Sequence, residues 1–220
     1  MSSPMSMTGP WMPAAAGEAT RRRLTGRQAA TVQRLADALV SELAEVSYDA
    51  LTVRNVARRA GVSPATAYTY FTSKAHLVAE VFWRRLVALP DTPAEPGAGA
   101  AERAAAVLRD VAALVAADPH LSAACSPALL GADPDVAVLR DRIGAELHRR
   151  LHRAVAGDRS AGGDGPAARP SPTGDDVDLV TALDFMVAGA LLRAGMGHMS
   201  YGDLGDRLAS LAHLVIGDRP

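Results

Sequence analysis

The amino-acid sequence predicts an all-α protein. Its 220 residues are 49% hydrophobic, but aromatic residues contribute only 4%, so the apolar part consists mostly of Ala, Leu and Val. Many Ala and Leu residues with few β-branched runs favour helices over sheets. Apolar residues also recur at spacings of three and four along most of the chain, which is the period of an amphipathic helix, whereas strand-like alternation is not found.

Four helices are predicted in the N-terminal part. Apolar residues at helical spacing mark the first over 27–45, and a hydroxyl suited to an N-cap begins each of the next three. Proline is favourable at the first position of the third helix, because no N–H is needed there. A glycine between the second and third helices can take the positive φ that closes a helix. The start signals are Thr52, Ser63-Pro64 and Thr72-Ser73, and the glycine is Gly61.

Five further helices are predicted beyond a proline-rich loop at 90–99. The second of them is expected to be broken at Pro127, because proline lacks the N–H that a helix interior uses. The stretch 157–174 is rich in Gly, Pro, Ser and Ala, and this composition is typical of a flexible loop. The five predicted helices cover 101–117, 120–130, 136–155, 175–199 and 204–215.

The two parts of the chain differ in charge. Residues 21–89 contain eleven basic and five acidic side chains, whereas the rest of the chain contains twelve basic and nineteen acidic ones. The overall net charge of −1 therefore combines a basic N-terminal module (+6) with an acidic remainder (−7). A basic module attracts a phosphate backbone, while an acidic part resists lying along DNA.

The sequence indicates neither a membrane protein nor an oxidising compartment. The start, MSSPMSMTGPWMPAAAGEATRRR, carries its charges after a weakly apolar part broken by prolines, unlike a secretory signal. No run approaches the roughly 20 apolar residues that a membrane span needs, and a single Cys125 cannot form an internal disulfide. We expect a cytoplasmic protein without membrane contact, in which residues 1–23 form a disordered arm.

A helix, a turn containing glycine and a second short helix form a helix-turn-helix between residues 52 and 71. The second helix of such a motif can enter the major groove of DNA. Residues 64–67 are small, so the N-terminus of that helix can approach the bases closely. Tyr68 offers a long reach that ends in a phenol, and Tyr70 can place its hydroxyl on a phosphate. The alternative for both tyrosines is packing within the small domain, which is the favoured interpretation for Phe71.

The segment LTVRNVARRAGVSPATAYTYFTSKAHL (51–77) resembles the DNA-binding signature of the TetR family of transcriptional regulators. In that family a Thr opens the second helix, A-x-x-A-G-V-S makes the turn, and Y-x-Y-F-x-S-K ends the recognition helix. The resemblance implies a helix-turn-helix DNA-binding domain at 24–72. It also implies a helical effector-binding and dimerisation domain at 73–220.

The resemblance implies DNA contacts from nine residues. Two positions depart from the family pattern: Ala65 stands where Gly is common, and Thr69 where a longer side chain is often found. Few long side chains therefore remain for the bases, and shape readout is expected to add to direct readout. Residues 21–23 are either an arm for the minor groove or a solvated charge run. The implied phosphate contacts are Thr52, Arg54, Tyr70 and Lys74, and the implied base or groove contacts are Ser63, Pro64, Ala65, Thr66 and Tyr68.

In the same family the C-terminal helices hold an effector and pair with a second copy around a two-fold axis. Small residues permit close approach of helices, and flexible apolar residues suit a hydrophobic effector. Packing within one chain is the alternative for both sets. The expected dimer residues are Gly189, Ala190, Ala194, Gly195, Gly197, Leu208 and Leu211, and the expected pocket residues are Leu114, Leu129, Phe185, Met186, Met196 and Met199.

The sequence predicts no cofactor and no metal site. His148 and His152 have the i,i+4 spacing of a metal pair, but they lie among arginines that oppose a cation. Cys125 could sense oxidants, although a free cysteine usually serves packing. Walker, GxGxxG, GxSxG, HExxH and CxxC motifs are absent from the sequence, which argues against an enzyme.

The sequence therefore predicts a dimeric transcriptional repressor that binds a palindromic operator in double-stranded DNA. Release is expected from a small, mainly hydrophobic effector of the lipid, sterol or acyl-CoA kind, because DPHLSAA (118–124) and LVIGD (214–218) resemble segments of actinobacterial regulators of lipid and sterol breakdown. The alternatives are a transcriptional activator and a DNA binder that needs no ligand.

Overall fold

The structure is a computed structural model that describes residues 26–93, 95–157 and 174–217. In these ranges the chain is all-α, as predicted, with nine helices and no strand. The predicted arm at 1–23 and nearly all of the predicted loop at 157–174 lie outside the described residues. The helices are α1 Gly26–Leu43, α2 Val53–Arg59, α3 Pro64–Tyr70, α4 Lys74–Ala88, α5 Ala100–Ala116, α6 Pro119–Leu130, α7 Pro134–Ala156, α8 Gly174–Gly195 and α9 Leu204–Ile216.

The three predicted start signals are confirmed. Thr52 Oγ1 accepts a hydrogen bond from the backbone N–H of Asn55 at 3.1 Å. Ser63 Oγ accepts from the N–H of Thr66 at 3.1 Å, and Ser73 Oγ accepts from a backbone N–H at 3.0 Å. Each hydroxyl thus satisfies one of the unpaired amides of a helix start. These caps fix where α2, α3 and α4 begin.

Two predicted boundaries are wrong. Pro127 lies inside α6 and does not break it, because Leu121, Ala124 and Ala128 are buried on one side and hold the helix in place. The eighth helix ends before residue 199, since Gly197 has a φ of 78°. That left-handed conformation, which glycine adopts without a steric penalty, closes α8.

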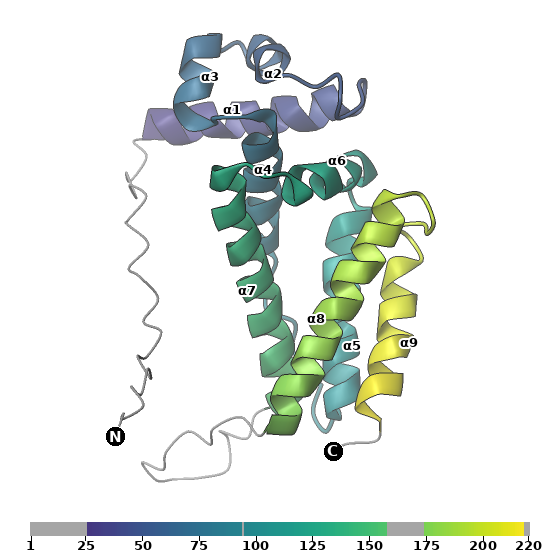
Figure 1. Cartoon of the computed structure of the whole chain (residues 1–220). Helices are drawn as coiled ribbons and strands as arrows, with labels where there is room; N and C mark the ends of the chain where they lie inside the picture. The colour runs from purple at the N-terminus through teal and green to yellow at the C-terminus, as the bar shows by residue number, and fades with distance from the viewer. Residues whose placement is uncertain (1–25, 94, 158–173, 218–220) are drawn as a thin grey trace, which may run out of the picture.

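The helices form two units joined by α4 (Figure 1). α1, α2 and α3 lie together at one end of the molecule, and α4 leads from them into the remainder. α7 runs beside α4, while α5, α8 and α9 form a layer beyond them and α6 crosses at the end of this layer nearest to α1. The arrangement leaves α2 and α3 at the far end of the molecule, each with one side packed and one side exposed.

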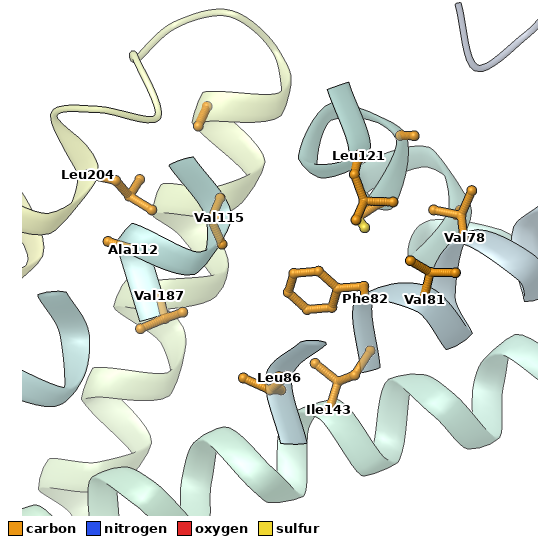
Figure 2. Packing of buried hydrophobic residues seen from close by; sticks show 14 of the residues in the cluster. Val78, Val81, Phe82, Leu86, Ala112, Val115, Leu121, Ile143, Val187 and Leu204 are labelled. Atoms are coloured by element: carbon orange, nitrogen blue, oxygen red, sulfur yellow. The ribbon is translucent and has the colours of Figure 1, made fainter. Parts of the chain in front are cut away.

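The core of the larger unit is built from small and branched side chains (Figure 2). Phe82 of α4 is its large aromatic residue and points between α5, α6 and α7. Leu121 of α6 and Ile143 of α7 are buried around it, and Val187 of α8 is buried beside Ala112 and Val115 of α5. Because α4 carries core residues along its length, the helix that leaves the DNA-binding motif is also part of this core. No helix of the described ranges is long and apolar enough to cross a membrane.

Candidate nucleic-acid interface

The turn between α2 and α3 has the predicted geometry. Gly61 has a φ of 64°, in the left-handed region that favours glycine. The N–H of Gly61 donates to the carbonyl of Arg58 at 3.2 Å, and the N–H of Val62 donates to the carbonyl of Ala57 at 2.9 Å. Two bonds back to the end of α2 thus reverse the chain and set the angle at which α3 leaves.

α3 is held on the protein by one side and exposed on the other. Ala67 and Phe71 are buried, so the helix is anchored at its middle and at its end. The edge of the Phe71 ring also contacts His76, with centroids 5.8 Å apart. The side chain of Tyr68 is 46% exposed. The exposed residues on and next to α3 are Ser63, Pro64, Ala65, Thr66, Tyr68 and Thr69.

The short hydroxyl groups on α3 already have partners within the helix. Ser63 Oγ and Thr66 Oγ1 lie 2.8 Å apart and share a hydrogen bond, and Thr69 Oγ1 donates to the carbonyl of Ala65 at 3.0 Å. Within the described residues the hydroxyl of Tyr68 has no such partner. Tyr68 is therefore the long exposed side chain of α3 whose polar end is free to meet a ligand.

Two arginines on α2 face solvent beside α3. Arg54 and Arg58 are exposed, and neither forms an ion pair within the described residues. Arg58 was not among the predicted DNA contacts. Its spacing of four residues from Arg54 could have revealed it, because such residues share one side of a helix.

Arg59, by contrast, braces α2 against α1. Its Nε donates to Glu42 at 2.6 Å and its Nη2 donates to Glu45 at 2.5 Å. These two carboxylates raise the pKa of Arg59, with Glu45 the larger cause. In return, the hydrogen bond from Arg59 lowers the pKa of Glu45. Glu42 is buried, so Arg59 supplies the partner that a buried carboxylate requires.

Tyr70 and Lys74 lie deeper than the other predicted contacts. Tyr70 is half-buried and packs against the core. Lys74 Nζ donates to the carbonyls of Tyr48 at 2.8 Å and Asp49 at 3.1 Å. The same ammonium group lies 4.5 Å from the centre of the Tyr48 ring, a cation–π contact. Lys74 therefore ties the start of α4 to the connection between α1 and α2.

The residues predicted for the dimer interface divide between the core and the surface. Ala194 and Leu208 are buried within the chain, and Ala190 and Gly195 are half-buried. Gly189, Gly197 and Leu211 are exposed. Around Gly189 and Leu211 the outward side of α8 and α9 carries further apolar groups. We call it the α8–α9 apolar surface; its large exposed residues are Phe185, Leu192, Met196, Leu211, Leu214 and Val215.

The structure does not bring the six predicted pocket residues together. Phe185 and Met196 are exposed on α8 and belong to the α8–α9 apolar surface. Three of the six, Phe185, Met186 and Met199, line one open groove of about 650 Å³ between α8 and α9. The remaining two, Leu114 and Leu129, are half-buried and pack against the core from α5 and α6.

The alternative metal and redox residues have ordinary surroundings. His148 Nδ1 lies 2.7 Å from Asp184 Oδ2, and its ring stacks against His152. Within the described ranges no three potential ligand residues form a metal-binding group. Cys125 is buried, and burial raises the pKa of its thiol to about 12. A thiol with so high a pKa is a poor nucleophile.

Comparison with known proteins agrees with this geometry. The family model described as bacterial regulatory proteins, tetR family, matches residues 35–81. An HTH-type transcriptional regulator of Mycobacterium tuberculosis (strain H37Rv) is 42% identical over 192 residues, which are 86% of this chain and 82% of the relative. The HTH-type transcriptional repressor KstR of Rhodococcus jostii is 26% identical over 187 residues, covering 84% of this chain and 82% of KstR.

Solved structures share the fold. A TetR transcriptional regulator from Rhodococcus sp. RHA1 has a TM-score of 0.66 at 21% identity and covers 87% of this chain and 98% of its own. FadR from Bacillus subtilis, in complex with stearoyl-CoA, has a TM-score of 0.63 at 19% identity and covers 84% and 97%. At these identities the likeness concerns the fold alone, and it confirms a helix-turn-helix followed by a helical domain.

Proposed function

Because this chain belongs to the TetR family of bacterial regulatory proteins, we propose that it is a repressor that binds a palindromic operator as a dimer and leaves it when a small hydrophobic effector binds. The relatives and structural neighbours named above are transcriptional regulators, and this chain is a regulator rather than an enzyme. The observation that carries the proposal is the outward side of α3, which is polar and small-sided and is anchored from behind by Ala67 and Phe71.

α3 is the proposed recognition helix. Its N-terminus carries no bulky side chain, so it can lie deep in a major groove, and Tyr68 can reach a base edge from the next turn. The exposed arginines of α2 would meet the phosphates beside the groove, which fixes the register of the protein on the duplex. The proposed base or groove contacts are Ser63, Pro64, Ala65, Thr66 and Tyr68, and the proposed phosphate contacts are Thr52, Arg54, Arg58, Tyr70 and Lys74.

Lys74 can serve both the fold and the phosphate. An ammonium group has three N–H donors, and two of them are used by the carbonyls of Tyr48 and Asp49. The third remains for a phosphate oxygen at the edge of the groove. Lys74 would thus connect the bound DNA to the α1–α2 connection and to α4 at once.

A second copy of the chain is the proposed partner of the α8–α9 apolar surface. Phe185 is 74% exposed and Leu214 78% exposed, and large apolar patches are rarely left uncovered on soluble proteins. A two-fold axis at this surface gives a self-complementary contact. It would also present two recognition helices to successive major grooves about 34 Å apart.

The proposed effector is a small, mainly hydrophobic molecule. The residues of α4, α5, α6 and α7 that meet in the core are nearly all apolar, so a ligand bound among them would gain from burying an apolar body. The fold relative FadR was solved with stearoyl-CoA, and we propose the same class, long-chain acyl compounds or sterols, for this chain.

DNA binding is tested by fluorescence anisotropy with the intergenic DNA upstream of the gene. We expect salt-sensitive, sequence-selective binding of two protomers per site, weakened about 100-fold by Tyr68→Ala combined with Arg54→Ala. Val138→Ala is the control, since Val138 is exposed on α7. Absence of a selective complex, or undiminished binding by the double variant, would reject the proposal.

The effector is tested separately by thermal unfolding with stearoyl-CoA, free coenzyme A and cholesterol. Binding to the native state raises the unfolding temperature, and we expect stearoyl-CoA or cholesterol to do so where free coenzyme A does not. The active compound should also release the operator. Operator binding without any response to these compounds would favour the alternative of a ligand-independent DNA binder.

A further inference from the structure

Two consecutive residues at the junction of α3 and α4 bond to the start of α7. Thr72 Oγ1 donates to Asp135 Oδ2 at 2.7 Å, and Ser73 Oγ donates to Asp133 Oδ2 at 2.5 Å. Both acceptors are carboxylates, and hydrogen bonds to an ionised acceptor are stronger than neutral ones. The end of the proposed recognition helix is thereby fastened to the C-terminal unit by side chains.

The bond between Ser73 and Asp133 joins the caps of two helices. Ser73 Oγ accepts from the N–H of His76 and so caps α4. Asp133 Oδ1 accepts from the N–H of Asp135 and so caps α7. Because each residue uses one atom or lone pair for its own helix and one for the other, the two helix starts are held at a fixed separation. The hydrogen bond from Ser73 also lowers the pKa of Asp133.

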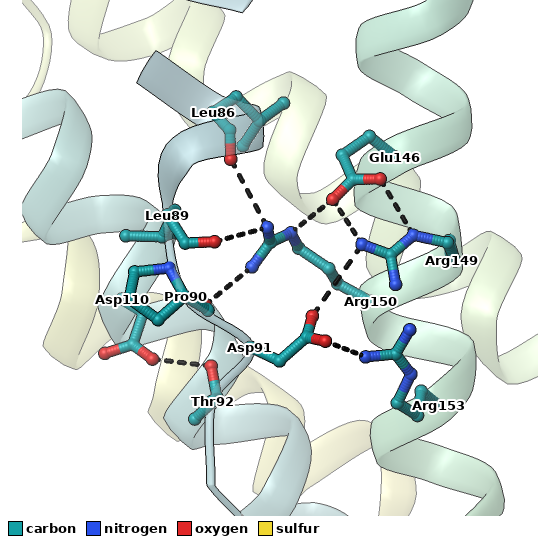
Figure 3. A network of polar contacts seen from close by, with 10 residues as sticks. All are labelled: Leu86, Leu89, Pro90, Asp91, Thr92, Asp110, Glu146, Arg149, Arg150 and Arg153. Carbon is teal, nitrogen blue, oxygen red and sulfur yellow. Dashed lines mark hydrogen bonds and ion pairs between the residues drawn. The ribbon is translucent and has the colours of Figure 1, made fainter. Parts of the chain in front are cut away.

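A second fastening lies at the other end of α4 (Figure 3). Arg150 of α7 is buried, and its guanidinium group points at the carbonyls that end α4. Its Nη2 donates to Leu89 at 2.7 Å and to Leu86 at 3.3 Å, and its Nη1 donates to Pro90 at 2.9 Å. Glu146 accepts from its Nε at 2.7 Å. The carbonyl of Leu86 also accepts from the N–H of Leu89 at 3.2 Å. Arg150 thus supplies, from α7, donors to the carbonyls at the end of α4, where a helix runs out of backbone N–H partners.

The two fastenings have the same register. At the N-terminal end the bonded residues are 60 and 63 positions apart, and at the C-terminal end they are 60, 61 and 64 apart. Since every α-helix rises 1.5 Å per residue, a constant offset means that α4 and α7 run parallel without slipping over about 22 Å. Between the ends, Ala79 packs against Val136 and Leu139. Figure 1 shows both helices running away from the DNA-binding unit.

From these contacts we infer that α4 and α7 move as one strut, and that Asp133 and Asp135 of α7 are positioning residues for the recognition helix. The inference rests on the proposed role of α3 as the recognition helix. It adds the contacts through which the C-terminal unit sets the orientation of α3. An effector that releases DNA must then displace α7 against its neighbours α5 and α8. It need not bend α4, because any movement of the α7 N-terminus is passed through Ser73 and Thr72 to the end of α3.

The strut is tested by measuring the distance between two spin labels. The labels are attached at Thr69→Cys on α3 and Ala145→Cys on α7, two exposed positions. The protein carries Cys125→Ala, and it is diluted with unlabelled protein so that only distances within one chain are measured. The parent should give one narrow distance. Asp133→Ser with Asp135→Ala should broaden it: the serine can still cap α7 but has no second oxygen for Ser73. Asp141→Ala is the control, because it removes an exposed charge from the same helix. An unchanged distance in the double variant would overturn the inference.

The other end of the strut has a matched pair of variants. Arg149 and Arg150 both bond to Glu146. Arg150 also donates to the carbonyls of Leu86 and Leu89 at the end of α4, whereas Arg149 reaches only the exposed side chain of Asp91, at 3.7 Å. Arg150→Met keeps the length of the buried side chain and should broaden the same distance, whereas Arg149→Met should not. If Arg150→Met fails to fold, Thr72→Val removes one exposed bond of the N-terminal end and decides the question. An equal response to both arginine variants would contradict the strut.

These measurements need neither operator nor effector. A failure of DNA binding would reject the proposed function and leave the label distances as they are. If the label distance stays narrow in the Asp133→Ser with Asp135→Ala variant, the strut is rejected, and the proposal of DNA binding is not affected. Where both hold, the Asp133→Ser with Asp135→Ala variant should bind operator about tenfold more weakly at an unchanged affinity for unrelated DNA, because it loses orientation rather than charge contacts with phosphate.

Discussion

Two surfaces of the molecule expose side chains that the fold does not need, and they differ in kind. The outward side of α3 carries hydroxyl groups and the phenol of Tyr68 on a helix of seven residues. The α8–α9 apolar surface carries large hydrocarbon groups, of which Phe185 and Leu214 are the most exposed. Both are backed by buried apolar side chains, so the difference lies in what each surface offers to a partner. The first suits a hydrated, charged duplex, and the second gains only where water is excluded.

The contrast also concerns when each surface is covered. A large apolar surface costs free energy whenever it stays in water, so its partner should be present at all times. A polar surface is stable in water and can remain exposed while no partner is bound. The α8–α9 surface is therefore expected to form a lasting contact between two copies, and α3 a reversible contact with DNA. Four predictions, taken from the largest expected effect to the smallest, test this division.

Phe185→Glu should break the proposed dimer. The change removes an aromatic anchor and puts a charge where water is excluded, so the dissociation constant of the dimer should rise at least about 100-fold. Analytical ultracentrifugation measures it, and operator affinity should fall as well because the two half-sites are no longer linked. Leu130→Glu is the control, since Leu130 is 71% exposed at the end of α6. A dimer that survives Phe185→Glu would assign this residue to an effector site and remove the contrast.

Tyr68→Ala should weaken binding to the operator about 10- to 30-fold, the loss of one base contact. The unfolding temperature should not change, because the side chain is largely exposed and its hydroxyl bonds to no other described residue. Tyr68→Phe separates the hydroxyl from the ring: a loss of selectivity with Phe indicates a hydrogen bond to a base. Anisotropy with operator and with scrambled DNA gives both numbers. Equal losses on the two DNAs would mean that Tyr68 does not read sequence.

The polar surface could be predicted from the sequence because its signals are local. A helix cap depends on residues three positions apart, as in Ser63 and Thr66, and the turn depends on one glycine, Gly61. These residues adopt the same geometry wherever the rest of the chain goes. The prediction that Pro127 breaks α6 failed for the opposite reason, since packing from other helices overrides a local preference.

The apolar surface and the strut depend on residues far apart in the sequence. Phe185 and Met186 are neighbours of similar character, yet Phe185 faces solvent and Met186 packs inward, and only the placement of α5 and α9 decides which. Likewise Arg150 belongs to a run of arginines that reads as a solvated surface, but it is the buried one of that run. Its carbonyl partners lie about 60 positions away, so no local pattern could reveal them.

Arg58→Ala and Arg59→Ala should separate DNA binding from folding within α2. The side chain of Arg58 is exposed and forms no ion pair or hydrogen bond within the described residues. Its loss should weaken operator binding about fivefold and reduce the slope of log affinity against log salt concentration by about one. Arg59 serves Glu42 and Glu45 instead, and its loss should lower the unfolding temperature. Anisotropy at several salt concentrations and thermal unfolding measure the two effects. A salt slope that falls for Arg59→Ala as well would place both arginines on the phosphates.

Acid should affect the two surfaces unequally. The pKa of Glu45 is lowered by its hydrogen bond from Arg59, from an ordinary value of 4.5. A carboxyl group with a lowered folded-state pKa adds stability that is fully present above its unfolded value and is lost as the pH falls through the folded one. The α1–α2 brace should therefore weaken below about pH 4.5, whereas Phe185, Leu211 and Leu214 carry no group that titrates. Glu45→Gln should lower the unfolding temperature at pH 7 by no more than about 2 °C, since an exposed ion pair contributes little. This difference should shrink as the pH falls through the folded-state pKa of Glu45. The proposed dimer should persist at a pH at which the α1–α2 brace has weakened. If the two copies instead dissociate at pH 4 to 5 while the brace is intact, charge rather than apolar contact holds them together.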